Sequence, residues 1–256
     1  MPRALWTGAS GMAAQQINVD LVANNIANVN TTGFKRQRAN FQDLYYDIAT
    51  APGTRAGDLG QNPTGTQIGT GVKLSGTPRI FTTGNIEVTG NPTDLAIDGE
   101  GFFEVTLPDG ATKAYTRAGD FRFDSQGNLV TPDGYLTGVQ GFDASLGPVS
   151  VSTDGLVSQN GTTIGQMNLV RFANPAGLTA IGRNLFTESL GSGTPTTVTP
   201  GTNGIGTIRN GALEKANVEV VTELVNLIVA QRAFEANSKS IKTSDEMLRT
   251  ANEIIR

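Results

Sequence analysis

The sequence predicts an α+β protein in which helices at the two ends of the chain pair in the manner of a coiled coil and flank an inserted antiparallel all-β domain. Apolar residues recur every seven positions near both ends of the chain, which is typical of helices packed along a narrow stripe. Between the ends, short apolar stretches alternate with Asp-Gly and Pro-Asp-Gly turns at intervals of roughly ten residues. With 256 residues, 38% of them hydrophobic, the chain can form one large or two smaller cores.

The N-terminal helix is predicted from one series of apolar residues. Leu5, Met12, Val19 and Ile26 each follow the last by seven positions, and alanines fill adjacent places. Gly33 can take the left-handed conformation that closes a helix. We therefore expect a helix that ends shortly before this glycine.

A longer series predicts the C-terminal helix. Its members, again seven positions apart, are Leu213, Val220, Leu227, Phe234, Ile241, Leu248 and Ile255. The neighbouring row turns polar along its length: Leu224, Gln231, Ser238, Asp245 and Asn252. This helix should therefore be apolar along a narrow stripe only.

Stretches rich in Gly, Pro and Thr separate the β domain from the helices at 50–71 and 191–206. The predicted organisation is a discontinuous helical core domain (1–32 and 214–256), connecting segments (33–75 and 205–213) and a β-rich outer domain (76–204).

The N-terminal helix is almost free of charge. Asp20 is the one charged residue between Ala4 and Phe34, and the polar positions are filled by asparagine and glutamine. Such side chains could simply solvate a surface helix and cap its end. The missing charges favour a helix enclosed by protein on several sides, where a bonded amide is tolerated and a charge is costly.

Composition excludes several classes of function. The net charge is -4, without a basic cluster, which argues against a nucleic-acid partner. Cysteine and histidine are absent, so thiolate nucleophiles, Ser-His-Asp triads and zinc sites with Cys or His ligands are excluded. No run of roughly 18 apolar residues exists to insert into a membrane, and the start of the chain does not resemble a cleavable secretory signal. We expect no catalytic, cofactor or metal site.

Rival hypotheses rest on the β domain. A glycosidase could use a carboxylate pair drawn from Asp94, Asp98, Glu100 and Glu104, or from Asp120 and Asp124. Most of these residues belong to ordinary turn dipeptides or bracket a short strand. The stretch "DSQGN" lacks enough ligands for a calcium loop. A secreted adhesin or lectin-like module would explain the middle of the chain but not its two ends.

Three segments carry a resemblance to a known family. "ANNIANVNTTGFKRQR", "DLAIDGEGFFEV" and "VNLIVAQRAFEANSKSIKTSDEMLRTAN" resemble, in this order, motifs of the bacterial flagellar rod and hook family. "FQDLYYDIATAPGT" followed by "GTQIGTGVKL" is similar to the distal-rod branch. Proximal rod subunits are the nearest alternative, whereas hook proteins are usually longer in the middle. The residues matching the two terminal signatures are Ala23, Asn24, Asn25, Ala27, Asn28, Gly33 and Phe34, and Gln231, Arg232, Ala233, Phe234, Glu235 and Asn237.

The resemblance implies a structural subunit that polymerises helically into a hollow, torque-transmitting shaft around the export channel. Its implied partners are further copies of itself, proximal rod and hook subunits, the surrounding ring bushing and the flagellar export apparatus. Its implied location is the basal body across the periplasm, reached without a cleaved signal. The residues expected at subunit contacts are Leu5, Met12, Val19, Asn24, Asn25, Ile26, Asn28, Leu213, Val220, Leu227, Gln231, Phe234, Ile241, Leu248 and Ile255.

Overall fold

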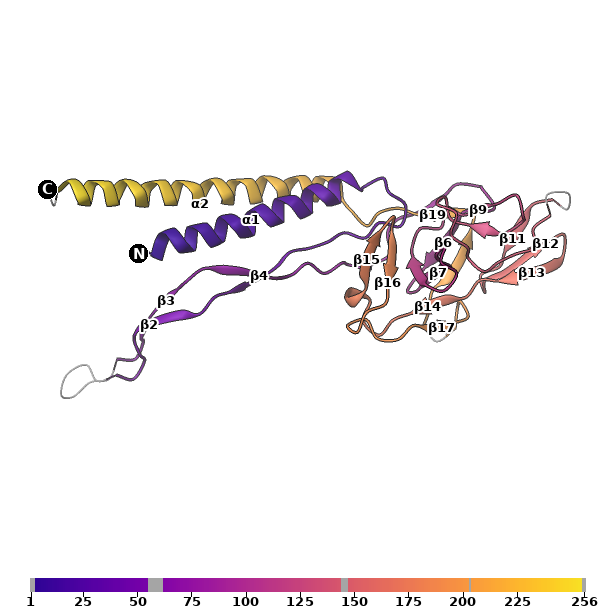
Figure 1. Ribbon diagram of the computed structural model, residues 1–256, viewed down its shortest axis with the longest axis horizontal. Helices are drawn as coiled ribbons and strands as arrows, with labels where there is room; N and C mark the ends of the chain where they lie inside the picture. The colour runs from indigo at the N-terminus through magenta and orange to yellow at the C-terminus, as the bar shows by residue number, and fades with distance from the viewer. Residues whose placement is uncertain (1–2, 55–61, 144–146, 203, 255–256) are drawn as a thin grey trace. The chain divides into compact units, whose positions relative to one another are not determined.

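A computed structural model describes residues 3–54, 62–143, 147–202 and 204–254. The chain divides into two compact units (Figure 1). Unit 1 comprises Met1–Ile26, Gln37–Pro78 and Val220–Arg256, and unit 2 comprises Ala27–Arg36 and Arg79–Glu219. The terminal helices pack together and flank antiparallel sheets in the chain, so the predicted α+β class is confirmed.

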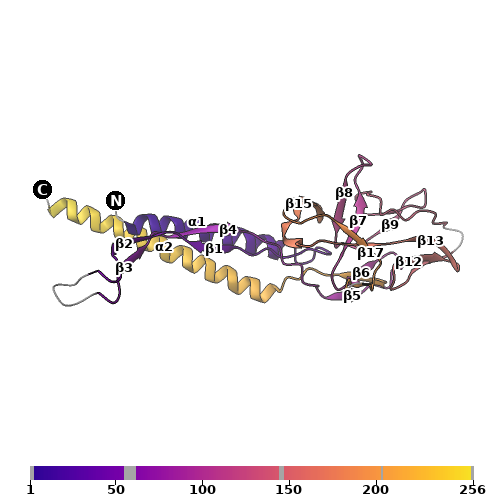
Figure 2. The ribbon, with the colours of Figure 1, turned by 90° about the horizontal axis from the view of Figure 1, so that it is seen from below.

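Unit 1 is built on the helix pair α1 (Arg3–Ala27) and α2 (Val220–Ile254), which Figures 1 and 2 show from two sides. Two glycines explain how closely the helices approach each other. A Cβ atom on Gly8 would lie 2.8 Å from Cγ1 of Ile241, and one on Gly11 would lie 2.8 Å from Nδ2 of Asn237. These residues weaken α1 in isolation but admit α2 side chains. Neither helix, within the described residues, is long and apolar enough to cross a membrane.

The other part of unit 1 is a two-stranded antiparallel ribbon in which β1 pairs with β4 and β2 with β3. It contacts α1 where Val72 N donates a hydrogen bond of 3.4 Å to Ser10 Oγ. The segment 33–75, expected as a connection, thus contains regular structure. The strands are β1 (Asn40–Asp43), β2 (Tyr46–Thr50), β3 (Thr66–Gly69) and β4 (Val72–Gly76).

Unit 2 is built from small antiparallel sheets around one sheet of six strands, whose order is β15-β16-β8-β7-β14-β17. Two-stranded pairs β18-β6, β19-β5 and β9-β10 and the three-stranded sheet β11-β12-β13 complete it. The strands are β5 (Ile86–Val88), β6 (Leu95–Asp98), β7 (Phe102–Thr106), β8 (Lys113–Thr116), β9 (Arg122–Phe123), β10 (Leu129–Val130), β11 (Val149–Val151), β12 (Leu156–Gln159), β13 (Thr162–Gln166), β14 (Leu169–Arg171), β15 (Thr179–Gly182), β16 (Leu185–Thr187), β17 (Thr196–Val198), β18 (Thr207–Asn210) and β19 (Ala212–Glu214), with a short 3₁₀ turn η2 (Pro175–Gly177).

Both faces of the six-stranded sheet are buried. Along β7, Phe103 faces the larger core with Val105, while Phe102 faces a second, aromatic cluster. The same alternation places Leu169 and Val170 of β14 in different clusters. Successive strand residues point to opposite faces, so one strand can serve two cores.

The C-terminal segment of unit 2 closes the unit by pairing with its beginning. Ile208 of β18 lies opposite Ile97 of β6, and Leu213 of β19 lies opposite Glu87 of β5. The helical pattern was expected to start at Leu213, but this residue belongs to a strand, and α2 begins at Val220. Asn217 Nδ2 donates a 2.7 Å hydrogen bond to Ile80 O, which holds the segment before α2 against unit 2.

The turn at Gly33 supplies a stability test of this packing. Gly33 has φ +68°, and a Cβ on it would lie 2.5 Å from the backbone N of Ala118, whereas Gly110 has φ +71° and open space around it. We expect Gly33→Ala to lower the free energy of unfolding of unit 2 by about 2 to 5 kcal/mol, and Gly110→Ala by about 1 kcal/mol. Urea unfolding followed by circular dichroism measures both; equal effects would mean that only backbone strain, not packing, matters at Gly33.

Candidate assembly interface

The face of α2 that meets α1 carries two rows of residues. Ile241 contacts Gly8, and the predicted row continues along the helix through the half-buried Phe234 and Leu227. The second row, also seven positions apart, consists of Glu223, Ala230, Asn237 and Ser244. Glu223 and Ala230 are buried, so the inner face of α2 uses small and polar residues beside the apolar series.

Asn25 is a buried hydrogen-bonding clamp at the end of α1. Its Nδ2 donates to Gln37 O at 2.9 Å, and Gln37 N donates to its Oδ1 at the same distance. Nδ2 also lies 3.4 Å from Oε2 of Glu223 on α2. The amide therefore ties α1 to the returning chain and to α2, as expected for an enclosed polar group.

Other amides of the helix have local partners. Gln16 Nε2 donates to Asp20 Oδ1 at 3.1 Å on the exposed side of α1. Asn28 accepts two hydrogen bonds from Thr31, through its backbone oxygen at 3.0 Å and its Oδ1 at 3.2 Å. The unusual asparagine content of this segment thus serves both the helix pair and the turn that follows α1.

Unit 2 contains a buried ionic cluster formed by Lys35, Arg117 and Glu214. Lys35 Nζ lies 2.5 Å from Glu214 Oε1, and Arg117 Nη1 lies 3.4 Å from Glu214 Oε2. Lys35 also donates to Thr82 O at 2.7 Å, and Gly84 N donates to Glu214 Oε1 at 2.7 Å. One carboxylate therefore compensates two cations that come from distant parts of the chain.

Burial controls the charge of this cluster. Lys35 and Glu214 are fully buried, and Arg117 is nearly so. Burial lowers the pKa of Lys35 to about 8, while the attraction of Glu214 opposes this shift. Lys35 therefore remains mostly protonated at neutral pH, and removing the carboxylate would leave two uncompensated cations.

The opposite side of α2 exposes apolar side chains. Val221, Leu224, Val225, Ile228 and Val229 follow the spacing of one helical face, and all are exposed. α2 is thus apolar on two sides near its start, which the seven-residue series alone did not reveal. A contiguous exposed apolar stripe of this kind marks a protein contact.

The structure places the expected contact residues in different environments. Asn25 is buried, and eight others are half-buried: Leu5, Met12, Val19, Ile26, Asn28, Leu227, Phe234 and Ile241. Four are exposed on the helices: Asn24, Val220, Gln231 and Leu248. Leu213 is half-buried in β19, and Ile255 lies outside the described residues.

The residues that form the ionic cluster and the second row of α2 were not predicted from the sequence. Lys35 stands in the basic stretch "KRQR", which by composition indicates a solvent-facing segment. Glu223 and Ala230 could have been found from their positions four before and three after Leu227, because such neighbours share a helix face.

Apart from Asp120, the carboxylates considered for catalysis have structural partners. Asp98 pairs with Arg209 at 3.2 Å, Glu104 with Lys113 at 2.7 Å, and Glu100 with Arg171 at 3.7 Å. Asp94 accepts hydrogen bonds from Thr89 and Asn91. Asp124 of "DSQGN" accepts from the backbone N–H groups of Gln126 and Asn128, which makes it a turn cap. Among the described residues no three Asp or Glu side chains converge to hold a metal ion.

Three segments of the chain match families of flagellar rod and hook proteins. Residues 5–35 match the family described as flagella basal body rod protein, residues 96–159 match the flagellar hook protein FlgE/F/G D1 domain, and residues 209–254 match the flagellar basal body rod FlgEFG protein C-terminal family.

Individual relatives agree with these matches. The chain is 49% identical to the flagellar basal-body rod protein FlgG of Borreliella burgdorferi over 100% of both chains. It is 42% identical to FlgG of Bacillus subtilis over 97% of both chains. Its similarity to the flagellar hook protein FlgE of Helicobacter pylori, 47% identity, covers 62% of this chain and 22% of that protein.

The buried ionic cluster predicts unequal effects of two similar substitutions. Glu214→Gln should lower the free energy of unfolding of unit 2 by about 3 to 5 kcal/mol, because Lys35 and Arg117 would lose their buried counter-charge. Glu87→Gln removes a half-exposed ion pair between β5 and Lys215, which directly follows β19, and should change the free energy of unfolding by less than about 1 kcal/mol. Urea denaturation measures the difference; similar values would show that the cluster is not a main support of unit 2.

Proposed function

The chain belongs to the FlgG family of flagellar basal-body rod proteins, which are structural and not enzymatic, and we propose that the exposed faces of its terminal helices join copies into the helical polymer of the distal rod. The observation that carries this proposal is the exposed apolar stripe of α2 from Val221 to Val229. Burying such side chains contributes about 1.5 to 3 kcal/mol each, and a neighbouring subunit can cover them.

Helical growth requires a contact between different surfaces of successive copies, because a head-to-tail contact that does not close produces a filament. The outer side of α1 carries few charges and is a suitable counterpart to the stripe of α2. It exposes Trp6, and between the exposed charges Arg3 and Asp20 its polar side chains are uncharged amides and hydroxyls, so burying this stretch costs little electrostatic free energy.

The ribbon of unit 1 supplies a further contact surface. Tyr45, Tyr46, Ile48 and Ile68 are exposed on a ribbon of only two strands. An isolated two-stranded ribbon is marginally stable in water, so contacts to neighbouring copies would stabilise it.

Within the polymer we place α2 beside the central channel and α1 outside it. Exposed charges on the C-terminal half of α2 support this order, because Lys239, Lys242, Arg249 and Glu253 stay hydrated beside water. The terminal segments predicted at 1–32 and 214–256 then supply the core of the shaft through α1 and α2, and 76–204 lie outside it. Residues 205–219 carry β18 and β19 and belong to unit 2, so they precede the core and are not part of it. A map of the assembled rod in which α1 lines the lumen would contradict this arrangement.

The family relationship is the only support for the individual partners of the rod. We propose contacts of the rod with proximal rod subunits at one end and hook subunits at the other, with the ring bushing around it. We also propose delivery by the flagellar export apparatus and a position across the periplasm. The expected contact residues that lie exposed on the helices, such as Gln231 and Leu248, are the first candidates for contacts between copies.

Val229→Asp tests the proposed interface. Val229 is 62% exposed, so the change should leave the isolated subunit folded, yet it places a charge in the apolar contact and should prevent rod assembly. The matched control is Val88→Asp, at a valine of unit 2 that is 78% exposed, which should leave rods intact. Electron microscopy of isolated basal bodies and swimming in soft agar measure assembly. Normal rods with Val229→Asp would show that this stripe is not a subunit contact.

A further inference from the structure

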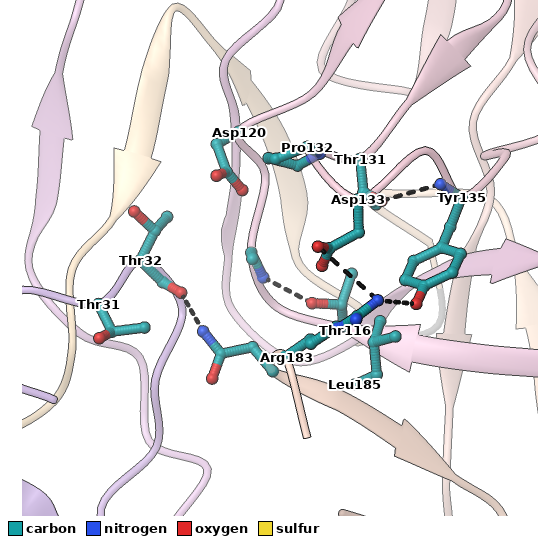
Figure 3. A pocket seen from close by; sticks show the side chains of 12 residues that line it. Thr31, Thr32, Thr116, Asp120, Thr131, Pro132, Asp133, Tyr135, Arg183 and Leu185 are labelled. Atoms are coloured by element: carbon teal, nitrogen blue, oxygen red, sulfur yellow. Dashed lines mark hydrogen bonds and ion pairs between the residues drawn. The ribbon is translucent and has the colours of Figure 1, made fainter. Parts of the chain in front are cut away.

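Unit 2 contains a cavity of about 270 Å³ between four chain segments, lined by both polar and apolar side chains (Figure 3). Thr31 and Thr32 come from the turn after α1, Asp120 follows β8, Asp133 lies after β10, and Arg183 belongs to the β15–β16 hairpin. We propose that this cavity binds a primary ammonium group carried on a slender aliphatic chain, with the carboxylate of Asp120 as its counter-charge.

The Asp120 carboxylate is the group in the cavity that lacks a partner. It is half-buried, and within the described part of the chain no other residue donates a hydrogen bond to it. Figure 3 shows it on the cavity wall without an interaction to the other labelled side chains. Its charged neighbours are Asp94, Asp133 and the single cation Arg122. Burial, followed by the two neighbouring aspartates, raises the pKa of Asp120.

The guanidinium in the cavity is already engaged elsewhere. Arg183 Nη1 donates to Tyr135 Oη at 2.6 Å and lies 3.9 Å from Asp133 Oδ1. Arg183 and Asn184 both have positive φ, +54° and +57°, and Asn184 Nδ2 donates to Thr32 O at 2.9 Å. These bonds hold the strained turn in place, so Arg183 compensates Asp133 and not Asp120, whose cationic neighbour is Arg122.

The chemistry of the cavity selects the ligand class. Two carboxylates against one engaged cation disfavour an anion, and the apolar part of the lining, which includes Pro132 and Leu185, can accept an aliphatic chain. The described residues offer no set of ligands for a metal ion. An ammonium group has three donors and one positive charge, which suits a carboxylate in a cavity that threonine side chains also line. A free aliphatic amine and a lysine side chain of a partner protein carry the same group.

Nuclear magnetic resonance titration of the ¹⁵N-labelled full chain tests the proposal. The probe is Nα-acetyl-lysine methylamide, and its control is the Nε-acetylated form, which keeps the shape and lacks the charge. We expect saturable shifts of the amide signals around the cavity with the first ligand only. Equal shifts with both ligands, or none with the first, would overturn the proposal.

Two variants separate the role of Asp120 from a general effect of charge. Asp120→Asn should weaken binding about tenfold or more, while Asp109→Asn, at an exposed turn outside the cavity, should leave it unchanged. Unchanged affinity in Asp120→Asn would exclude this carboxylate as the counter-charge. Circular dichroism confirms that the variant is folded.

The pH dependence and a second amine complete the test. Affinity should fall as the pH is lowered through the raised pKa of Asp120, since the lysine ammonium keeps its proton there. This dependence should be absent from the Asp120→Asn titration, and its persistence there would contradict the assignment. Cadaverine that binds as well as the lysine derivative supports a free amine as the source, and preference for the lysine derivative supports a lysine side chain.

Discussion

The ionic cluster of Lys35, Arg117 and Glu214 is the interaction on which the organisation of this chain depends. Lys35 follows α1, Glu214 precedes α2, and 179 residues separate them in the sequence. Glu214 also forms part of β19, which pairs with β5 near the start of the β domain. Unit 2 is therefore complete only when the segment that follows the inserted β domain has joined it. The contact between Lys35 and Glu214 joins the segment that follows α1 to the segment that precedes α2.

The cluster also explains why an inserted domain can carry buried charge. Burying an ion is costly unless its partners and remaining donors are satisfied. Here the backbone supplies acceptors for two of these donors, since Thr82 O accepts from Lys35 and Gly99 O accepts from Arg117, whereas the buried Nε of Arg117 has no hydrogen-bond partner among the described residues. The loss of a single member therefore affects several segments that are held together by that member.

The helix pair follows a different principle. Its inner face combines the half-buried apolar series of α2 with close approach at glycines and with one bonded amide, Asn25. This leaves the apolar residues near the start of α2 on the outside, where they have no partner within the described unit. The helices of such a subunit have little intrinsic stability, and association would bury their exposed apolar side chains. Both properties fit a structural rod protein.

Carboxylates in unit 2 show how environment decides the role of a residue type. Asp98 and Glu104 form exposed or half-exposed ion pairs across strands, and Asp124 caps a turn. Asp120 has the same chemistry but stands at a cavity whose cation is engaged by another carboxylate. Local sequence around these four residues does not separate them, because the difference lies in which distant side chains reach them.

The sequence by itself determined the α+β class, the two terminal helices and the turn-rich middle, because periodicity and turn chemistry are local properties that neighbouring residues encode. Tertiary structure alone decided that Leu213 lies in a strand, that Lys35 is buried and that Asn25 meets Glu223, 198 residues away. The family resemblance located the functional class but not these contacts. Long-range pairing changes the environment of a residue without changing its local pattern, so burial of charge becomes visible only when distant segments lie side by side.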